Sequence, residues 1–181
     1  NNHYEIGGLI EKDDGLIDHN LGYPVIGTDD DLEKLRQKYS RALVTVGQLK
    51  SSKIRIKLYE LLSDLNFVLP VIISSKAYVS KTAKIGKGTI VMHGAIVNAN
   101  ALIGVNCILN NKALIEHDAV IGDHCHISTG AIINGEVKVG NESFIGSGAV
   151  TKQTISIGRN CVIGAGSIIK SDIQSNQIIK N

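Results

Sequence analysis

The sequence predicts a small α/β domain over residues 1–74 and a parallel β-helix over residues 75–181. The main observation is a six-residue repeat that runs from Ala77 to Asp172 through sixteen units without an insertion. Its third place is Val, Ile or Leu in every unit except that of Thr151, and its first place is usually a small residue. The residues before the repeat instead alternate strand-like and helix-like patterns.

The α/β domain begins with a predicted strand over Tyr4–Glu11. Thr28 and Asp31 form a capping pair ahead of a predicted helix over Leu32–Tyr39. Strands separated by helices imply a parallel sheet. A Rossmann-like sheet normally opens with a strand that leads into a glycine-rich turn. Because this pair is absent here, we expect a truncated Rossmann-like sheet. A further strand, helix and strand are expected over Ala42–Val46, from Ser51 or Ser52 onward, and over Val68–Ile73.

Each unit of the repeat predicts a short strand with places one and three facing inward and place two facing outward. Three strands would complete a coil of about 18 residues, and stacked coils would lie about 4.8 Å apart. Cys107, Cys125 and Cys161 recur at multiples of this interval at the inward place, which favours buried core thiols over a redox or catalytic role. Glycines suited to a turn with positive φ recur in one column, at Gly86, Gly104, Gly122, Gly140 and Gly158.

The outward second places divide into three faces, of which one is mixed and two are apolar. Apolar outer faces of this extent are unusual on a monomer, and a closed three-fold ring would cover both. We therefore expect a homotrimer. One apolar face carries Tyr78, Ile96, Leu114, Ile132, Val150 and Ile168, and the other carries Ile90, Ile108, His126, Phe144 and Val162.

Composition and charge exclude several classes of protein. Lys and Arg number 19 against 17 Asp and Glu, so the net charge of +2 gives no reason to expect nucleic acid or a membrane as a partner. The sequence contains no apolar run of about 18 residues, and its start lacks a signal-peptide pattern. We expect a cytoplasmic protein.

The uninterrupted units resemble the hexapeptide-repeat acyltransferases, which implies a left-handed β-helix. The segment NNKALIEHDAVIGDHCHISTGAIINGEVKVG after a small α/β domain resembles bacterial sugar acetyltransferases. These include enzymes that N-acetylate UDP-linked 4-amino-dideoxy sugars or GDP-perosamine, and related sialic-acid O-acetyltransferases. The resemblance covers nearly the whole chain, although the glycine-rich turn near the start and the Gly-Val-Pro-Ala tail of that family are absent from it.

The resemblance implies acetyl-CoA as the acetyl donor, no metal, and a small-molecule acceptor. The first expectation is N-acetylation of a nucleotide-linked 4-amino sugar for a bacterial surface glycan. O-acetylation of sialic acid is the alternative, since the same base can serve an amine or a hydroxyl group.

His117 is the candidate general base, because acetyl transfer needs a group that takes the proton of the acceptor. It lies in a predicted turn between Glu116 and Asp118, and an imidazole is mostly neutral at pH 7. Either carboxylate would orient the ring, whereas a turn histidine is often only solvated. The resemblance implies catalysis by His117 with Asp118 as its partner. It also implies that Asn110 positions the acceptor amine, although turn asparagines are common.

The resemblance assigns the acetyl-CoA contacts to His126, Gly135, Ser147 and Ala165. Small residues are frequent in turns, and a hydrogen-bonded interface residue is the alternative interpretation of His126. If the apolar faces meet across a trimer, His126 of one subunit approaches the His117 corner of the next, and each site needs two chains.

Three residues of the α/β domain lie at or directly after the ends of predicted strands, where parallel sheets bind ligands. Glu11, Lys12 and Gly47 resemble contacts to the nucleotide sugar, and solvated loop residues would give the same pattern.

Two other functions share the β-helix. A γ-type carbonic anhydrase binds zinc through three histidines, and the histidines here are not separated by 18 or 36 residues. A non-catalytic scaffold would need neither the pair of His117 and Asp118 nor the α/β domain.

Overall fold

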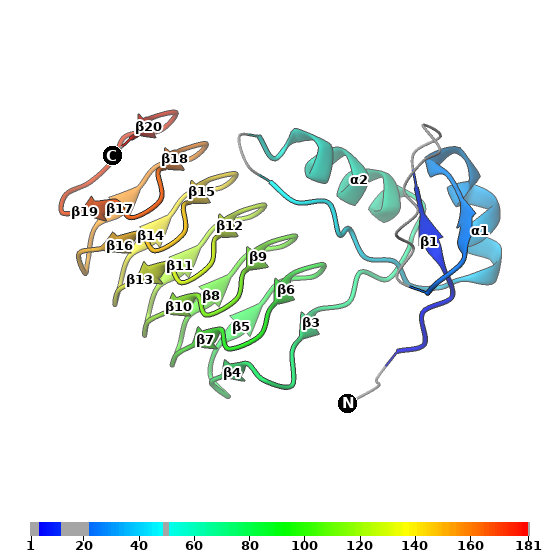
Figure 1. Cartoon of the computed structure of the whole chain (residues 1–181), viewed down its shortest axis with the longest axis horizontal. Helices are drawn as coiled ribbons and strands as arrows, with labels where there is room; N and C mark the ends of the chain where they lie inside the picture. Colours follow the sequence, from blue (N-terminus) through cyan, green and yellow to red (C-terminus); the bar gives the residue numbers. More distant parts are fainter. Residues whose placement is uncertain (1–3, 12–21, 49–50, 181) are drawn as a thin grey trace.

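The protein consists of a β-helix and an N-terminal α/β region that packs against one side of it (Figure 1). The structure is a computed structural model and describes residues 4–11, 22–48 and 51–180. The coils of the β-helix stack in sequence order from the end nearest the N-terminus to the C-terminus.

The repeat forms three parallel sheets of short strands. Leu114 pairs with Ile96 and Ile132, which lie 18 residues away on either side, so the predicted coil length is confirmed. Sheet I contains β3 (Ile72–Ile73), β6 (Ile90–Val91), β9 (Ile108–Leu109), β12 (His126–Ile127), β15 (Phe144–Ile145), β18 (Val162–Ile163) and β20 (Ile178–Ile179). Sheet II contains β4 (Tyr78–Val79), β7 (Ile96–Val97), β10 (Leu114–Ile115), β13 (Ile132–Ile133), β16 (Val150–Thr151) and β19 (Ile168–Ile169). Sheet III contains β5 (Lys84–Ile85), β8 (Leu102–Ile103), β11 (Val120–Ile121), β14 (Lys138–Val139) and β17 (Ser156–Ile157).

The core of the β-helix contains the first and third places of the repeat, as the period of two predicts. Its small residues are buried from Ala95 onward, and the aliphatic residues pack beside them, whereas Ala77 and Ala83 of the first coil are partly buried. The three cysteines belong to this core, and the Cys125 thiol donates to the carbonyl oxygen of Gly140 at 3.2 Å. The predicted core role of the cysteines is therefore confirmed.

The glycine column lies at the corner that leads from sheet III to sheet I. Contrary to the prediction, its members do not adopt a positive φ. The reason for glycine is instead the close contact between coils, because a Cβ on Gly122 would lie 2.7 Å from the backbone nitrogen of Asn141. The left-handed conformation occurs two residues later in the same turns, as at Asn106 with φ of 51° and His124 with φ of 60°.

The strands of the N-terminal region differ from those predicted, and the one between Val25 and Gly27 was not expected. β1 (Leu9–Ile10) and β2 (Val25–Gly27) pair in parallel, and a 3-10 turn (Asp29–Asp31) leads into α1 (Leu32–Lys38). The predicted capping pair is confirmed, since the backbone nitrogen of Thr28 donates to Oδ2 of Asp31 at 3.0 Å. The second predicted helix is α2 (Lys53–Asp64).

Two strands predicted for this region do not form as expected. Ala42–Val46 forms no strand, and the chain there makes only a bridge between Arg41 and Val68. Pro70 has no N–H for a sheet ladder, which interrupts the strand predicted over Val68–Ile73. Only the end of the predicted strand forms, as β3, and β3 pairs with β6. Sheet I therefore begins at Ile72, three residues before the predicted start of the β-helix at residue 75.

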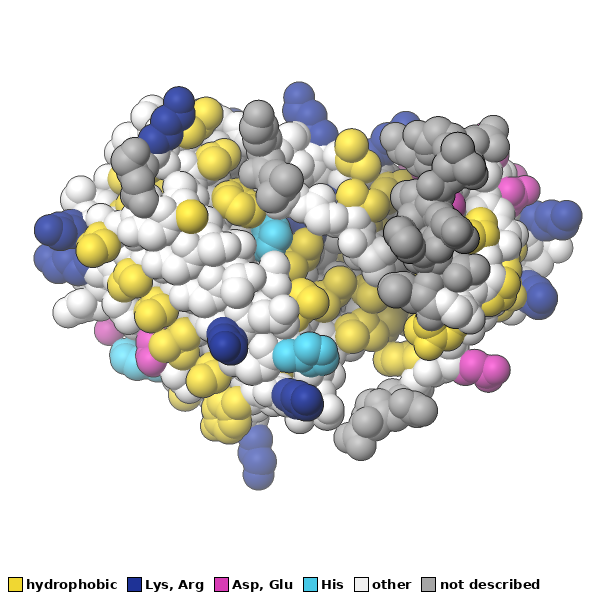
Figure 2. Space-filling view, viewed as in Figure 1, with side chains coloured by type: hydrophobic (Ala, Val, Ile, Leu, Met, Phe, Trp, Pro, Cys, Tyr) yellow, Lys and Arg dark blue, Asp and Glu magenta, His cyan; other side chains and the backbone are white. Residues whose placement is uncertain are grey.

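The N-terminal region covers part of the outer face of sheet I. Ile108 is 8% exposed and His126 is 7% exposed, although both point outward. The chain itself therefore buries part of one of the two apolar faces that favoured a trimer. The outer face of sheet II stays open, with Tyr78 58% and Ile168 69% exposed, and Figure 2 shows a diagonal row of hydrophobic side chains along its strands.

Candidate active site

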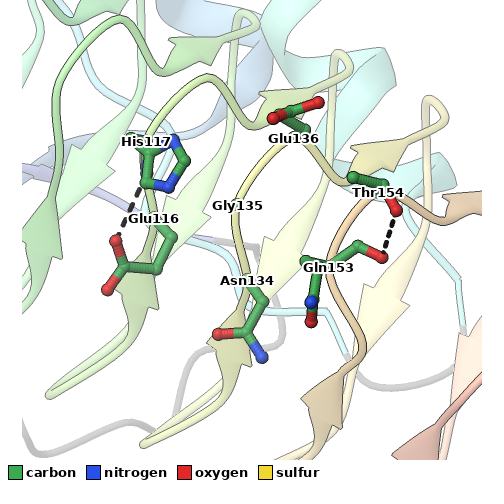
Figure 3. A pocket seen from close by; sticks show the side chains of 7 residues that line it. All are labelled: Glu116, His117, Asn134, Gly135, Glu136, Gln153 and Thr154. Carbon is green, nitrogen blue, oxygen red and sulfur yellow. Dashed lines mark hydrogen bonds between the residues drawn. The ribbon is translucent and has the colours of Figure 1, made fainter.

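A cavity of about 330 Å³ opens at the corner between sheets II and III, which we call the His117 corner. Its lining comes from turns that are stacked one coil apart (Figure 3). The lining residues are Glu116, His117, Asn134, Gly135, Glu136, Gln153 and Thr154. Two predicted catalytic residues and one predicted acetyl-CoA contact therefore lie together here.

His117 forms a hydrogen bond with the next residue, Asp118. The distance from Nδ1 to Oδ2 is 2.9 Å, and the two side chains are 57% and 48% exposed. Because a carboxylate only accepts, the proton lies on Nδ1 and the lone pair of Nε2 is available to take a proton. The pKa of His117 is raised, mainly by the hydrogen bond to Asp118 and further by the charges of Glu116 and Glu136. The same bond lowers the pKa of Asp118.

Two asparagines of the preceding coil hold the carboxylates that flank His117. Asn98 donates from Nδ2 to Glu116 at 2.9 Å, and Asn100 donates from Nδ2 to Asp118 at 3.2 Å. Each asparagine stands 18 residues before its carboxylate, so the coil register creates both contacts. Asp118 therefore orients the ring, while Glu116 accepts from Asn98 and from the backbone nitrogen of His117.

Gly135 stands one coil above His117 and leaves space for the imidazole. A Cβ at this position would lie 2.8 Å from Nε2 of His117. The glycine is not required by backbone conformation, because its φ is not positive and the same column carries Ala99 and Gln153. The His117 ring therefore accounts for the glycine at this position. Figure 3 shows the two residues on neighbouring turns of the cavity.

The other predicted site residues of the β-helix lie at the corner between sheets I and II, which we call the Asn110 corner. Asn110, Ser147 and Ala165 all occupy turns there. The hydroxyl groups of Ser128 and Ser147 form a hydrogen bond of 2.9 Å. Strand β10 lies between Asn110 and His117, so one chain holds the predicted site residues at two separate corners.

His126 lies on sheet I beside the Asn110 corner, beneath the N-terminal region. Its Nδ1 lies 2.9 Å from the carbonyl oxygen of Gln48, and Nδ2 of Asn110 lies 3.2 Å from its Nε2. The ring packs edge-on against Phe144, with 5.2 Å between ring centroids. Burial lowers the pKa of His126. A ligand contact through Nε2 would therefore replace or share the contact with Asn110.

The residues predicted to contact the nucleotide sugar lie in the N-terminal region, apart from the His117 cavity. Glu11 is half-buried, and its backbone nitrogen donates to the carbonyl oxygen of Gly27 at 3.2 Å. Gly47 is exposed in the segment that leads to Gln48. Lys12 lies outside the described residues.

Sequence reasoning missed four residues that line the cavity and two that support it. The missed residues share columns with the predicted ones, so the 18-residue interval was the signal that would have found them. They are Asn134, Glu136, Gln153 and Thr154 in the lining and Asn98 and Asn100 beneath it.

Two further features bear on the class of site. In residues 4–11, 22–48 and 51–180, no group of three or more His, Cys, Asp or Glu side chains is arranged to hold a metal ion. Across the same residues, no helix has the length and apolar character needed to span a bilayer.

The β-helix matches two family models for transferases. One describes a bacterial transferase hexapeptide of six repeats and matches residues 118–153. The other describes a hexapeptide repeat of succinyl-transferase and matches residues 136–171. No curated protein sequence matches the chain.

Solved structures extend the similarity to nearly the whole chain. The acetyltransferase domain of PglB from Neisseria gonorrhoeae, in complex with acetyl coenzyme A, is 34% identical with a TM-score of 0.88, covering 97% of this chain and 84% of that one. PerB from Caulobacter crescentus, in complex with CoA and GDP-perosamine, is 32% identical with a TM-score of 0.86, covering 90% and 78%. WeeI from Acinetobacter baumannii is 25% identical with a TM-score of 0.78, covering 91% and 77%.

The stacked six-residue units and the transferase models define the class as hexapeptide-repeat acyltransferases, with a left-handed β-helix. Within this class, the chain belongs to the acetyltransferase family that includes the GDP-perosamine N-acetyltransferase of Caulobacter crescentus and the acetyltransferase domain of PglB.

Proposed function

We propose that this protein transfers the acetyl group of acetyl-CoA to the amino group of a nucleotide-linked 4-amino sugar, with His117 as general base. The observation that carries the proposal is the pair of His117 and Asp118 at an open cavity, with the ring oriented so that Nε2 accepts a proton. PerB binds CoA and GDP-perosamine, and the PglB domain binds acetyl coenzyme A, which supports the choice of donor and acceptor.

The residues of the His117 corner fit the proton transfer that this reaction requires. As the acceptor nitrogen attacks the thioester carbonyl, Nε2 of His117 takes a proton from the nitrogen. A C–N bond forms, the C–S bond breaks, and CoA leaves as a thiolate that regains a proton from the imidazolium. Asp118 stabilises this imidazolium through its hydrogen bond to Nδ1.

Each active site is proposed to combine the His117 corner of one protomer with the Asn110 corner of the next in a homotrimer. This arrangement would bring Asn110 to the acceptor and place Ser147, Ala165 and His126 along the acetyl-CoA. Support comes from the separation of the two corners within one chain and from the apolar outer face of sheet II between them.

In the N-terminal region, Glu11, Lys12 and Gly47 are proposed to bind the acceptor, which is the nucleotide sugar. The product would be an N-acetylated nucleotide sugar for a bacterial surface glycan.

The test is incubation of the protein with acetyl-CoA and a panel of UDP-, GDP- and TDP-linked 4-amino sugars, with sialic acid as the hydroxyl acceptor. Mass spectrometry should detect a gain of one acetyl group on at least one amino sugar, together with release of an equal amount of CoA. Acetylation of sialic acid alone would replace the amine proposal with O-acetylation. CoA release at background with every acceptor would reject both.

A further inference from the structure

A buried hydrogen-bonded chain connects the N-terminal region to the Asn110 corner. Its members are Arg55, Gln48, His126 and Asn110, of which the first three are 2%, 3% and 7% exposed. We propose that Gln48 and Arg55 are positioning residues that fix the tautomer of His126 and, through it, the orientation of the Asn110 amide. This inference rests on the proposed role of Asn110 at the acceptor amine.

The tautomer of His126 follows from its two partners. The carbonyl oxygen of Gln48 has no proton to give, so Nδ1 of His126 donates to it. Burial lowers the pKa of His126 and keeps the ring neutral, so Nε2 carries a lone pair. The amide nitrogen Nδ2 of Asn110 therefore donates to Nε2 over 3.2 Å.

The orientation of Asn110 is set at both ends of its amide group. Its Oδ1 accepts from the backbone nitrogen of Asn111 at 2.7 Å, while its Nδ2 donates to His126. A flipped amide would direct Oδ1 at the lone pair of Nε2 and the NH₂ group at the N–H of Asn111, and both contacts would be repulsive. Asn110 thus offers its second amide proton to a ligand in a fixed direction.

The carbonyl group of Gln48 is held by its own side chain. Oε1 of Gln48 accepts from Nη2 of Arg55 at 3.0 Å, and Nε2 donates to the carbonyl oxygen of Glu142 at 3.2 Å. This side chain therefore joins α2 to the β-helix at the point where Gln48 contacts His126.

Arg55 is a buried cation without a carboxylate partner among the described residues. Its guanidinium donates to backbone carbonyl groups at the corner from sheet III to sheet I, with 2.8 Å between Nη2 and the oxygen of His124. Its Nε has no partner in the described part of the chain, and burial lowers its pKa. A buried cation is costly to desolvate, and its hydrogen bonds to the two backbone carbonyl groups offset part of that cost. The additional bond from Nη2 to Oε1 of Gln48 is the contact through which Arg55 would position Gln48.

The same series of hydrogen bonds would couple the Gly47 segment to the Asn110 corner, which are the two proposed parts of the acceptor site. Gly47, proposed to contact the nucleotide sugar, directly precedes Gln48 in the sequence. Binding that shifts this segment would move the carbonyl group of Gln48 and hence the amide of Asn110. The N-terminal region would in this way communicate with the Asn110 corner through four residues.

The tautomer is measured on the full-length protein by long-range ¹H–¹⁵N NMR with ¹⁵N-labelled histidine, without any substrate. The wild type should carry the His126 proton on Nδ1. Gln48→Met should give a mixture of tautomers, whereas Gln48→Glu keeps an acceptor for Arg55 and should stay closer to the wild type. Gln37→Met, on the exposed side of α1, serves as the matched control for the substitution and for thermal stability.

Kinetics supply the second measurement. Gln48→Met should raise the KM of the amino-sugar acceptor about tenfold, as expected when one hydrogen-bonded position is lost. A His126 proton on Nε2 in the wild type would overturn the inference, as would a Gln48→Met protein with unchanged tautomer and acceptor KM. The NMR result needs no acceptor, so failure of the proposed function would show separately, as the absence of any acetylated product.

Discussion

His117 is the residue on which the proposed chemistry depends most. His117→Ala removes the base and should lower kcat by about two to four orders of magnitude, measured as CoA release with an amino-sugar acceptor. Arg159→Ala is the control, because Arg159 is an exposed turn residue at the corner that leads from sheet III to sheet I, away from both proposed parts of the site. It should retain activity within about twofold. Equal loss in both variants would show that the effect is structural.

Asp118 determines the pH at which His117 works. A general base acts in its neutral form, and the bond to Asp118 raises the pKa of His117, so activity is lost on acidification from a higher pH than for a free imidazole. Asp118→Asn removes the charge and should move the acidic limb of the kcat/KM profile to lower pH, with a lower plateau. A limb that stays in place would mean that His117 is not the titrating group.

We expect Gly135 to be needed because it leaves space for the His117 ring, and not because the backbone requires a glycine conformation at this position. Gly135→Ala places a methyl group against Nε2, and we expect kcat to fall about tenfold from misplacement of the base. The melting temperature should also fall, and His117→Ala in the same chain should restore it, because the clash disappears. A double variant that melts no higher than Gly135→Ala would contradict this explanation.

At the scale of the elements, the β-helix followed directly from the six-residue register. Alternation placed the core residues correctly. The 18-residue interval also relates Asn98 to Glu116 and Asn100 to Asp118, although the sequence analysis did not use it there and missed both asparagines. The role of the glycine column was misjudged, because it depends on how closely the backbone of the next coil approaches each turn. For the same reason, the sequence did not predict that Gly135 leaves space for the His117 ring.

The attachment of α2 was not predictable from local pattern. The sequence around Arg55 is that of an ordinary exposed helix. The residue is buried only because α2 packs against the corner that leads from sheet III to sheet I. The strand expected over Ala42–Val46 failed similarly, because strand formation depends on a partner as well as on apolar residues.

Arg55 should therefore stabilise the attachment of α2. Arg55→Met leaves the carbonyl oxygens of Asn106 and His124 without their donor, and we expect the free energy of unfolding to fall by about 2–4 kcal/mol, measured by urea denaturation. Lys57→Ala, at an exposed position of the same helix, should change it by less than about 0.5 kcal/mol. Similar midpoints for both variants would show that the buried bonds contribute little.

At the scale of the whole molecule, the outer face of sheet II is the surface that we expect to contact a neighbour. Ile132→Asp puts a charge in the middle of this face and should convert a trimer into monomers in light scattering, with loss of activity. Lys138→Asp, on the mixed face of sheet III, should leave the mass unchanged. A wild-type protein that is a fully active monomer would reject the shared site.

A composite site, as proposed, would explain why the predicted residues divide between two corners. Gly135 joins the His117 corner, while Asn110, Ser147 and Ala165 occupy the Asn110 corner, and no rearrangement within one chain unites them across β10. The sequence register predicts both corners, but their meeting depends on assembly, which a single chain does not display.

The most direct test mixes two inactive proteins, His117→Ala and Asn110→Ala, by unfolding and refolding them together at equal concentration. In randomly mixed trimers, about one quarter of the shared sites would receive an intact corner from each partner, so activity should recover to about 25% of the wild type. Activity no higher than the sum of the two separate variants, in trimers shown to contain both chains, would contradict the account.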